Sequence, residues 1–173
     1  MKLEAKNIKF CEFASQDSNC FEATLYVDGK RTAILSDDGH GGGMMIHPAK
    51  GFTWDDIKKI QQHLAENNPA SLYNRETHEF EKVPYGTPDS MQYCLDFWMG
   101  DQLKKHLVKK DVQRLRKRVA FVKDGGVYTV GKARISQQEK EQLIQHVRKE
   151  HPEAIILSCL TEAEAIELYQ QCA

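Results

Sequence analysis

The sequence predicts an α+β protein, and three observations support this fold class. Apolar and polar side chains alternate from residue 21 to residue 28, which is the pattern of a half-buried strand. Two stretches in the middle of the chain, residues 53–67 and 89–116, carry apolar side chains at helical spacing. In the last third, a hairpin pattern and two capping boxes predict a β-β-α-β-α unit. We therefore expect an N-terminal antiparallel β-meander, a helical middle and this C-terminal unit.

The composition is that of an ordinary globular protein. Its 173 residues suit one domain or two small lobes, and 40% apolar with 28% charged residues argue against disorder. The 24 basic and 25 acidic residues leave a net charge of −1, so any attraction to nucleic acid must be local. No apolar run approaches the ~20 residues of a membrane span, and the N-terminus lacks a signal peptide's apolar core. We expect a cytoplasmic protein without a membrane partner.

The cysteines predict neither a disulfide framework nor a zinc site. Their number, five, is odd, and no two are spaced as C-x-x-C. We expect reduced thiols that mostly act as small buried apolar groups. The five are Cys11, Cys20, Cys94, Cys159 and Cys172.

The first lobe is predicted to begin with three strands. Asp28-Gly29 supplies the positive φ angles of a tight turn between the alternating strand and a partner that starts at Arg31. Apolar residues between Ile8 and Phe13 indicate an earlier strand. The three strands form an antiparallel meander, and a glycine-rich stretch follows where the third strand ends.

A helix is predicted after this stretch, with Thr53 as its cap and Asn67-Asn68-Pro69 as its end. One apolar stripe runs along it, made of Trp54, Ile57, Ile60, Leu64 and Ala65. Residues 70–88 are polar and irregular, with two prolines and a glycine near their end. We predict that this connector separates the lobes 1–69 and 89–173, with a single merged domain as the alternative.

The second lobe is predicted to open with a helix from Asp89 or Ser90, which Gly100 interrupts. A strongly basic helix follows over residues 101–116. Residues 118–134 have the pattern of a second hairpin with a glycine-rich turn.

Two capping boxes then predict the last helices. Ser136 with Glu139 begins one, and Thr161 with Glu164 begins the other. A short buried strand at 154–157 lies between them. We expect the helices of this unit to cover one face of a small sheet.

The stretch 36–47 combines backbone freedom with titratable side chains more densely than any other window. Consecutive glycines let backbone N–H groups converge on an anion. The residues predicted to bind an anion or a partner are Gly39, His40, Gly41, Gly42 and Gly43. The alternative is a divalent metal site, whose predicted ligands are Asp37, Asp38, His40 and His47.

Two familiar enzymatic interpretations of this stretch fail on missing residues. It lacks the Lys-Ser/Thr ending of a P-loop. His40 and the three glycines after it have the form of an esterase oxyanion loop, but the chain contains no Gly-x-Ser-x-Gly nucleophile elbow. The interpretation without function is a flexible polar connection.

The basic helix is the second candidate site. Phosphate groups attract such a cluster, and so does an acidic protein surface. The predicted binding residues are Lys109, Lys110, Arg114, Arg116, Lys117 and Arg118. No aromatic platform accompanies them, and a solvated face balanced by acids elsewhere is the alternative.

Residues Asp37 to Gly42, directly after the hairpin at Val27–Lys30, resemble small uncharacterised proteins of bacteriophages and mobile elements. The basic helix, the strand that follows it and the acidic last helix add to the resemblance. It implies a bacterial cytoplasmic setting and interference with a host system, and it assigns no residue a role.

We therefore expect a non-enzymatic binding protein that engages a host protein or a protein–nucleic acid complex. Nucleic acid would be contacted through the basic helix. Two alternatives stay open, both centred on residues 37–47: a metal-dependent or phosphate-acting enzyme, and a small-nucleotide binder.

Overall fold

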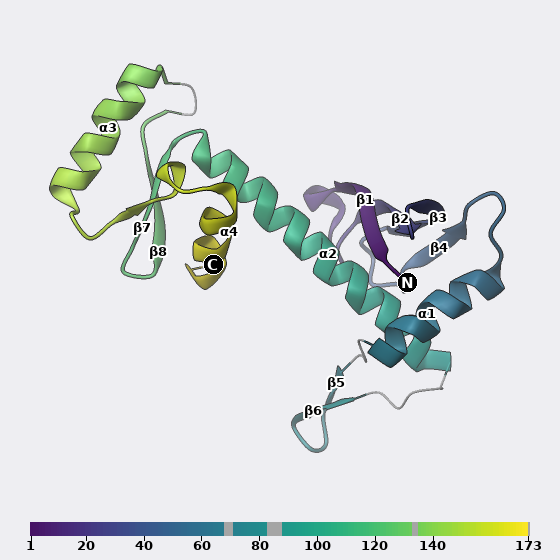
Figure 1. Ribbon diagram of the computed structural model, residues 1–173. Coiled ribbons are helices and arrows are strands. Elements are labelled where there is room, and N and C mark those ends of the chain that lie inside the picture. Colours follow the sequence, from purple (N-terminus) through teal and green to yellow (C-terminus); the bar gives the residue numbers. More distant parts are fainter. Residues whose placement is uncertain (68–70, 83–87, 133–134, 173) are drawn as a thin grey trace. The chain divides into compact units, whose positions relative to one another are not determined.

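The computed structural model describes residues 1–67, 71–82, 88–132 and 135–172 (Figure 1). Strands and helices are segregated along the chain, so the predicted α+β fold class is confirmed. The chain divides into two compact units, Met1–Leu103 and Lys104–Ala173. This division lies within one helix, whereas the sequence pattern placed it at 70–88. None of the helices in the described ranges is long and apolar enough to cross a membrane.

The first unit is built on a four-stranded antiparallel sheet in the order β1-β2-β3-β4. Its strands are β1 (Leu3–Phe10), β2 (Phe21–Val27), β3 (Lys30–Asp37) and β4 (Met45–Pro48). Asp28 and Gly29 have φ angles of 47° and 79°, as the predicted tight turn between β2 and β3 requires. The predicted meander is confirmed but has one strand more, because β4 follows the glycine-rich stretch and pairs Met45 with Ser36.

The core of this unit draws on β2, β3 and two helices. The alternation in β2 and β3 directs every second side chain inward, and the helix α1 (Trp54–Asn67) adds its apolar stripe. Thr53 caps α1: its hydroxyl accepts from the Asp56 N–H at 3.4 Å, and its own backbone N–H donates to Asp56 Oδ2 at 2.9 Å. The buried apolar residues of these elements are Ala23, Leu25, Ala33, Leu35, Ile57, Ile60, Leu64 and Ala65.

Two aromatic residues that the sequence assigned to the helix stripe and to the first strand are exposed. Trp54 is 57% exposed because it is the first residue of α1, one turn before the buried part of the stripe. Phe13 is 92% exposed and lies in a 3-10 turn, Glu12–Ala14, after β1 has ended. Both predictions were wrong at element ends, where periodicity does not determine the direction of a side chain.

Residues 71–82 form a hairpin, which corrects the prediction of an irregular connector. β5 (Ser71–Asn74) pairs with β6 (Glu79–Lys82). Tyr73 lies opposite Phe80, and their ring centroids are 5.4 Å apart in an edge-to-face arrangement. Cross-strand aromatic pairs stabilise such short strands.

The helix α2 (Pro88–Arg116) is continuous, so the prediction that Gly100 interrupts it is wrong. A glycine inside a helix costs only about 1 kcal/mol relative to alanine. The burial of Leu95, Met99 and Leu103 around it outweighs that cost. The proline at residue 88 suits the first helical position, where no N–H is needed.

The second unit contains a three-stranded sheet in the order β8-β7-β9. Asp124 and Gly125 have φ angles of 51° and 73°, so the predicted hairpin between β7 and β8 is confirmed. Its elements are β7 (Val119–Lys123), β8 (Gly126–Val130), α3 (Gln137–Glu150), β9 (Ile155–Ile156), a 3-10 turn (Leu157–Cys159) and α4 (Glu162–Cys172).

Helices pack on both faces of β7, which corrects the prediction that they cover one face (Figure 1). One cluster joins β7 to α2 and α4, and a second joins the opposite side of β7 to α3. The first consists of Val112, Ala120, Val122, Leu157 and Ala165, and the second of Val119, Phe121, Val147 and Ile156. This double covering explains why four consecutive residues of β7 are buried.

Both predicted capping boxes are confirmed. The Ser136 hydroxyl accepts from the Glu139 N–H at 3.2 Å, and Glu139 Oε2 accepts from the Ser136 N–H at 2.8 Å. Thr161 and Glu164 make the same two bonds, at 3.3 and 2.8 Å. Each box supplies partners for backbone groups that the first turn of a helix leaves unbonded.

Candidate functional site

The glycine-rich stretch is fastened to the loop between β1 and β2. The Gly39 carbonyl oxygen accepts hydrogen bonds from the backbone N–H groups of Gln16, Asp17 and Ser18, at 3.0, 3.0 and 3.3 Å. Gly39 is buried and has a φ of +89°. A Cβ at this position would overlap the carbonyl oxygen of Ala14. Its backbone angle and its surroundings therefore both favour glycine.

Two carboxylates accept hydrogen bonds from backbone N–H groups of this stretch. Asp37 Oδ1 accepts from the Gly39 N–H at 2.8 Å and from the Ser18 hydroxyl at 2.6 Å. Asp38 Oδ1 accepts from the His40 N–H at 3.1 Å. The Gly41 N–H donates to the Ser18 hydroxyl oxygen at 3.1 Å.

These bonds bear directly on the predicted anion site. Three of the N–H groups that an anion would need are bonded within the protein, two of them to negatively charged side chains. An anion approaching Gly39 to Gly41 would meet like charge. The arrangement therefore gives no support to a phosphate or nucleotide at these residues, while Gly42 and Gly43 are exposed.

The predicted metal ligands are distributed over the stretch and the strand after it. Asp37 is half-buried, whereas Asp38 and His40 are exposed. His47 is exposed on β4, opposite Ile34 of β3. Across residues 1–67, 71–82, 88–132 and 135–172, no group of three or more His, Cys, Asp or Glu side chains is placed to hold a metal ion. The metal site stays a prediction that this geometry does not favour.

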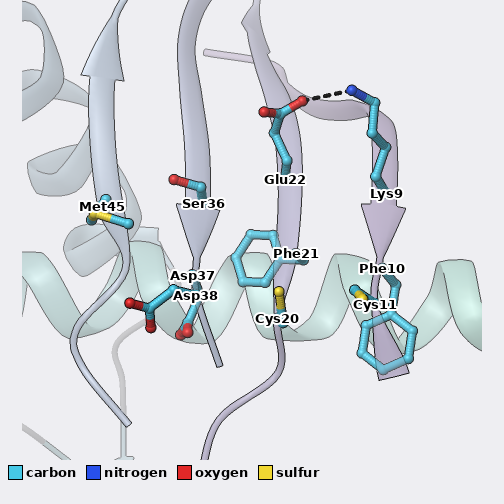
Figure 2. Close-up of a pocket in the computed structure, with 10 residues that line it drawn as sticks. All are labelled: Lys9, Phe10, Cys11, Cys20, Phe21, Glu22, Ser36, Asp37, Asp38 and Met45. Atoms are coloured by element: carbon cyan, nitrogen blue, oxygen red, sulfur yellow. Dashed lines mark hydrogen bonds and ion pairs between the residues drawn. The ribbon is translucent and has the colours of Figure 1, made fainter. Parts of the chain in front are cut away.

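A pocket of about 330 Å³ opens at the end of the sheet beside the same carboxylates (Figure 2). Lys9 and Glu22 form an ion pair on its border, at 2.8 Å. Phe10, Phe21 and Met45 give it an apolar lining, and two thiols are also exposed to it. The complete lining is Lys9, Phe10, Cys11, Cys20, Phe21, Glu22, Ser36, Asp37, Asp38 and Met45. Its volume is at the lower end of the range of small-molecule sites, ~300–1,000 Å³.

Asp96 of α2 is a candidate functional residue that the sequence analysis did not identify. Its Oδ1 atom is buried and has no hydrogen-bond partner within the described part of the chain. Burial, and secondarily the nearby charge of Asp37, raises the pKa of Asp96 to about 6. The sequence carried a signal, because Asp96 stands three and seven residues before Met99 and Leu103, both of which are buried.

The basic part of α2 separates into two groups of side chains. Lys109 and Arg116 turn toward their own unit. Lys109 pairs with Glu162 of α4 at 3.5 Å, and Arg116 Nη2 donates to the Leu160 carbonyl at 2.8 Å. These two predicted binding residues therefore contribute to the packing of the second unit.

Lys110, Arg114 and Lys117 form the other group, here called the cationic stripe. They are four and three residues apart, so they share one side of the helix, and all three are exposed. Arg114 pairs with Asp111 at 3.1 Å, while Lys110 and Lys117 make no ion pair with any described residue. Arg118 follows the end of the helix and is half-buried.

No protein-family model, curated protein or solved structure matches this chain. A function must therefore be argued from the chemistry of the described residues. Of the two surfaces that the sequence singled out, the glycine-rich stretch has most of its donors satisfied internally. The cationic stripe presents charge to solvent, so it is the better supported binding surface.

Proposed function

We propose that this protein is a non-enzymatic binding protein, and that the cationic stripe of α2 is its binding surface. The observation that carries the proposal is the exposure of Lys110, Arg114 and Lys117 on one side of a continuous helix. The partner is a polyanion: the phosphate backbone of a nucleic acid, or an acidic surface on a protein that contacts nucleic acid.

The spacing of the stripe suits repeated negative charges. A helix rises about 1.5 Å per residue, so Lys110 and Lys117 are about 10 Å apart along its axis, with Arg114 between them. Lys109 and Arg116 are engaged within the second unit. In the stripe, Arg114 pairs only with Asp111 of its own helix, and Lys110 and Lys117 make no ion pair with a described residue. A guanidinium between two ammonium groups can bond two oxygen atoms of a phosphate or carboxylate.

The setting of this activity is part of the proposal. We propose a bacteriophage protein that acts in the bacterial cytoplasm on a host protein or a protein–nucleic acid complex. The motivation is the resemblance of residues 37–42 and of the C-terminal pattern to small phage proteins.

The test compares the wild type with the triple variant Lys110→Glu/Arg114→Glu/Lys117→Glu. Fluorescence anisotropy measures binding to labelled duplex DNA, single-stranded RNA and poly-glutamate at 50 and 200 mM salt. If the stripe neutralises three phosphates, the affinity for duplex DNA falls about fortyfold between these salt concentrations, and that for single-stranded RNA about twentyfold. The triple variant should lose binding altogether, with an unchanged circular dichroism spectrum.

A matched control changes the net charge by the same amount elsewhere. Lys30, Lys50 and Lys132 are exposed, and their reversal to glutamate should leave binding within about twofold once salt screens distant charges. Preference for poly-glutamate over both nucleic acids would assign an acidic protein partner. Equal binding by the wild type and the stripe variant, or binding to none of the three polyanions, would overturn the proposal.

A further inference from the structure

Two cysteines face each other at the ends of β1 and β2. The pairing of these strands runs to Phe10 opposite Phe21, and the Cys11 N–H then donates to the Cys20 carbonyl at 3.0 Å. The two residues are therefore directly opposed in the antiparallel direction.

This opposition is of the kind that a disulfide can bridge. Hydrogen-bonded residues that face each other across antiparallel strands have Cα atoms about 5.5 Å apart, which falls within the usual Cα separation of cystines, about 4.4–6.8 Å. The second backbone bond of the pair is replaced by Ser15, whose hydroxyl accepts from the Cys20 N–H at 2.9 Å and donates to the Cys11 carbonyl at 2.9 Å. The two cysteines can therefore shift toward each other without breaking hydrogen bonds between β1 and β2, because both lie outside the paired strands.

Both thiols line the pocket described above, so a small reagent can reach them (Figure 2). Cys11 is exposed, and Cys20 is half-buried. Cys94, by contrast, is fully buried, and Cys159 and Cys172 belong to the other unit. The prediction that the cysteines are mostly buried apolar groups is therefore wrong for Cys11 and Cys159.

We propose that Cys11 and Cys20 are a reversible modification site, which a small-molecule disulfide oxidises to an intramolecular cystine. The Cys11 thiolate attacks one sulfur of the disulfide, forms a mixed disulfide and releases one thiolate. The Cys20 thiolate then attacks the Cys11 sulfur, forms the cystine and releases the second thiolate. The two protons of the cysteines end on the two released thiols, so the protein is oxidised by two electrons and the reagent is reduced by two.

The surroundings of the pair determine the order and the speed of these steps. Partial burial, and then Cys11, Asp37 and Asp38, raise the pKa of Cys20. The exposed Cys11 is therefore the attacking group and Cys20 the resolving one. The remaining charged groups of the pocket, Lys9 and Glu22, neutralise each other. The step in which Cys20 attacks speeds up as the pH rises, because only the thiolate attacks and the pKa of Cys20 is raised.

Oxidation would act on the loop that holds the glycine-rich stretch. The cystine would close a ring around residues 12–19, which contain Ser15 and the three N–H groups bonded to the Gly39 carbonyl. The redox state of the pair would thereby set the rigidity of the pocket rim.

The test treats the reduced wild type with oxidised glutathione at pH 7 and pH 8, quenches with N-ethylmaleimide and analyses the peptides by mass spectrometry. Cleavage after glutamate separates the two cysteines, because Glu12 lies between them and Glu4 and Glu22 flank them. The expected product is fragment 5–12 linked to fragment 13–22 and lighter by two hydrogen atoms. It should form up to about tenfold faster at pH 8 than at pH 7.

Two variants complete the design. In Cys11→Ser, Cys20 can form only a mixed disulfide, and in Cys159→Ser the linked fragments should form as in the wild type. Circular dichroism of the reduced variants checks that both are folded. The proposal is overturned if fragments 5–12 and 13–22 each carry glutathione without linking, or if both cysteines stay reactive toward the maleimide while Cys159 is already modified.

Discussion

Asp96 has its carboxyl group on the core side of α2. Its contribution to the free energy of unfolding therefore depends on pH. One of its oxygens is buried without a partner among the residues described. Neither Met99 nor Leu103, the neighbours on the same side of the helix, can donate a hydrogen bond to it. The ionised form is therefore less stable in the folded protein than in water, whereas the protonated form is tolerated.

The sign of the pH effect follows from the direction of the pKa shift. The pKa rises from 3.8 to about 6 on folding, so between these values the folded state binds more protons than the unfolded state. The contribution of Asp96 to the free energy of unfolding then falls as the pH rises from about 4 to about 6. A shift of two units corresponds to at most about 3 kcal/mol, because each unit is worth 1.4 kcal/mol.

We therefore expect Asp96→Asn to be more stable than the wild type at pH 7.5, by about 1–2 kcal/mol. The difference should shrink as the pH falls toward 4 and approach zero below it, where the Asp96 carboxyl group is protonated in the unfolded state as well. Urea unfolding of both proteins at several pH values measures it. Asp101→Asn, at an exposed position of the same helix, is the control and should show no such trend. A constant difference across this pH range would contradict the argument.

Between elements, the most specific contact is the one that fastens residues 37–41 to the loop after β1. One carbonyl oxygen, that of Gly39, accepts three backbone N–H groups, and two carboxylates bond the N–H groups beside it. The loop would otherwise leave these donors without protein partners. This contact also holds Asp37 at the border of the pocket.

Comparing Gly39→Ala with Gly29→Ala should separate the energetic cost of disturbing this contact from the cost of the left-handed backbone conformation. At Gly29, φ is +79° and nothing lies within 4 Å of a Cβ, so Gly29→Ala should cost only the left-handed conformation, about 1 kcal/mol. At Gly39, φ is similar, but the Cβ would meet Ala14 and come within 3.0 Å of the Cys20 Cβ. We expect Gly39→Ala to cost at least about 2 kcal/mol in chemical denaturation. Equal losses of stability at the two positions would show that the glycine-rich stretch and the loop after β1 can move apart at little cost.

The elements that the sequence predicted well are those with short-range signals. The Asp28-Gly29 and Asp124-Gly125 turns and the boxes that begin with Ser136 and Thr161 depend on residues within four positions of one another. Neighbouring residues determine these features, so tertiary packing does not need to be known.

The predictions that failed depended on contacts from distant parts of the chain. Gly100 does not end α2, because buried residues on both sides of it stabilise the helix. The alternation of β4 is too short to be recognised before its pairing with β3 is known. In the candidate site, the Asp37–Ser18 bond joins residues nineteen positions apart, so no spacing rule could have revealed that this carboxylate is engaged.

At the level of the whole molecule, the chain has two cores and one helix that contributes to both. Leu95, Met99 and Leu103 of α2 are buried in the first unit, and Val112 of the same helix is buried in the second. The sequence could not show that α2 contributes to both cores, because the helix continues without a break where the two units divide. Two cores of this kind can unfold separately or together, depending on how much of α2 melts with each.

Leu157→Ala distinguishes these cases. Leu157 is fully buried in the cluster that joins β7 to α2 and α4, so its truncation should cost about 2–5 kcal/mol. Because the first unit has its own core, we expect the amides of β7 and β8 to lose at least about 30-fold of their protection against hydrogen exchange, while those of β2 and β3 keep theirs. Leu25→Ala, at an equally buried position of the first unit, should give the reverse pattern. Equal losses in both units would mean that α2 couples them into one cooperative unfolding unit.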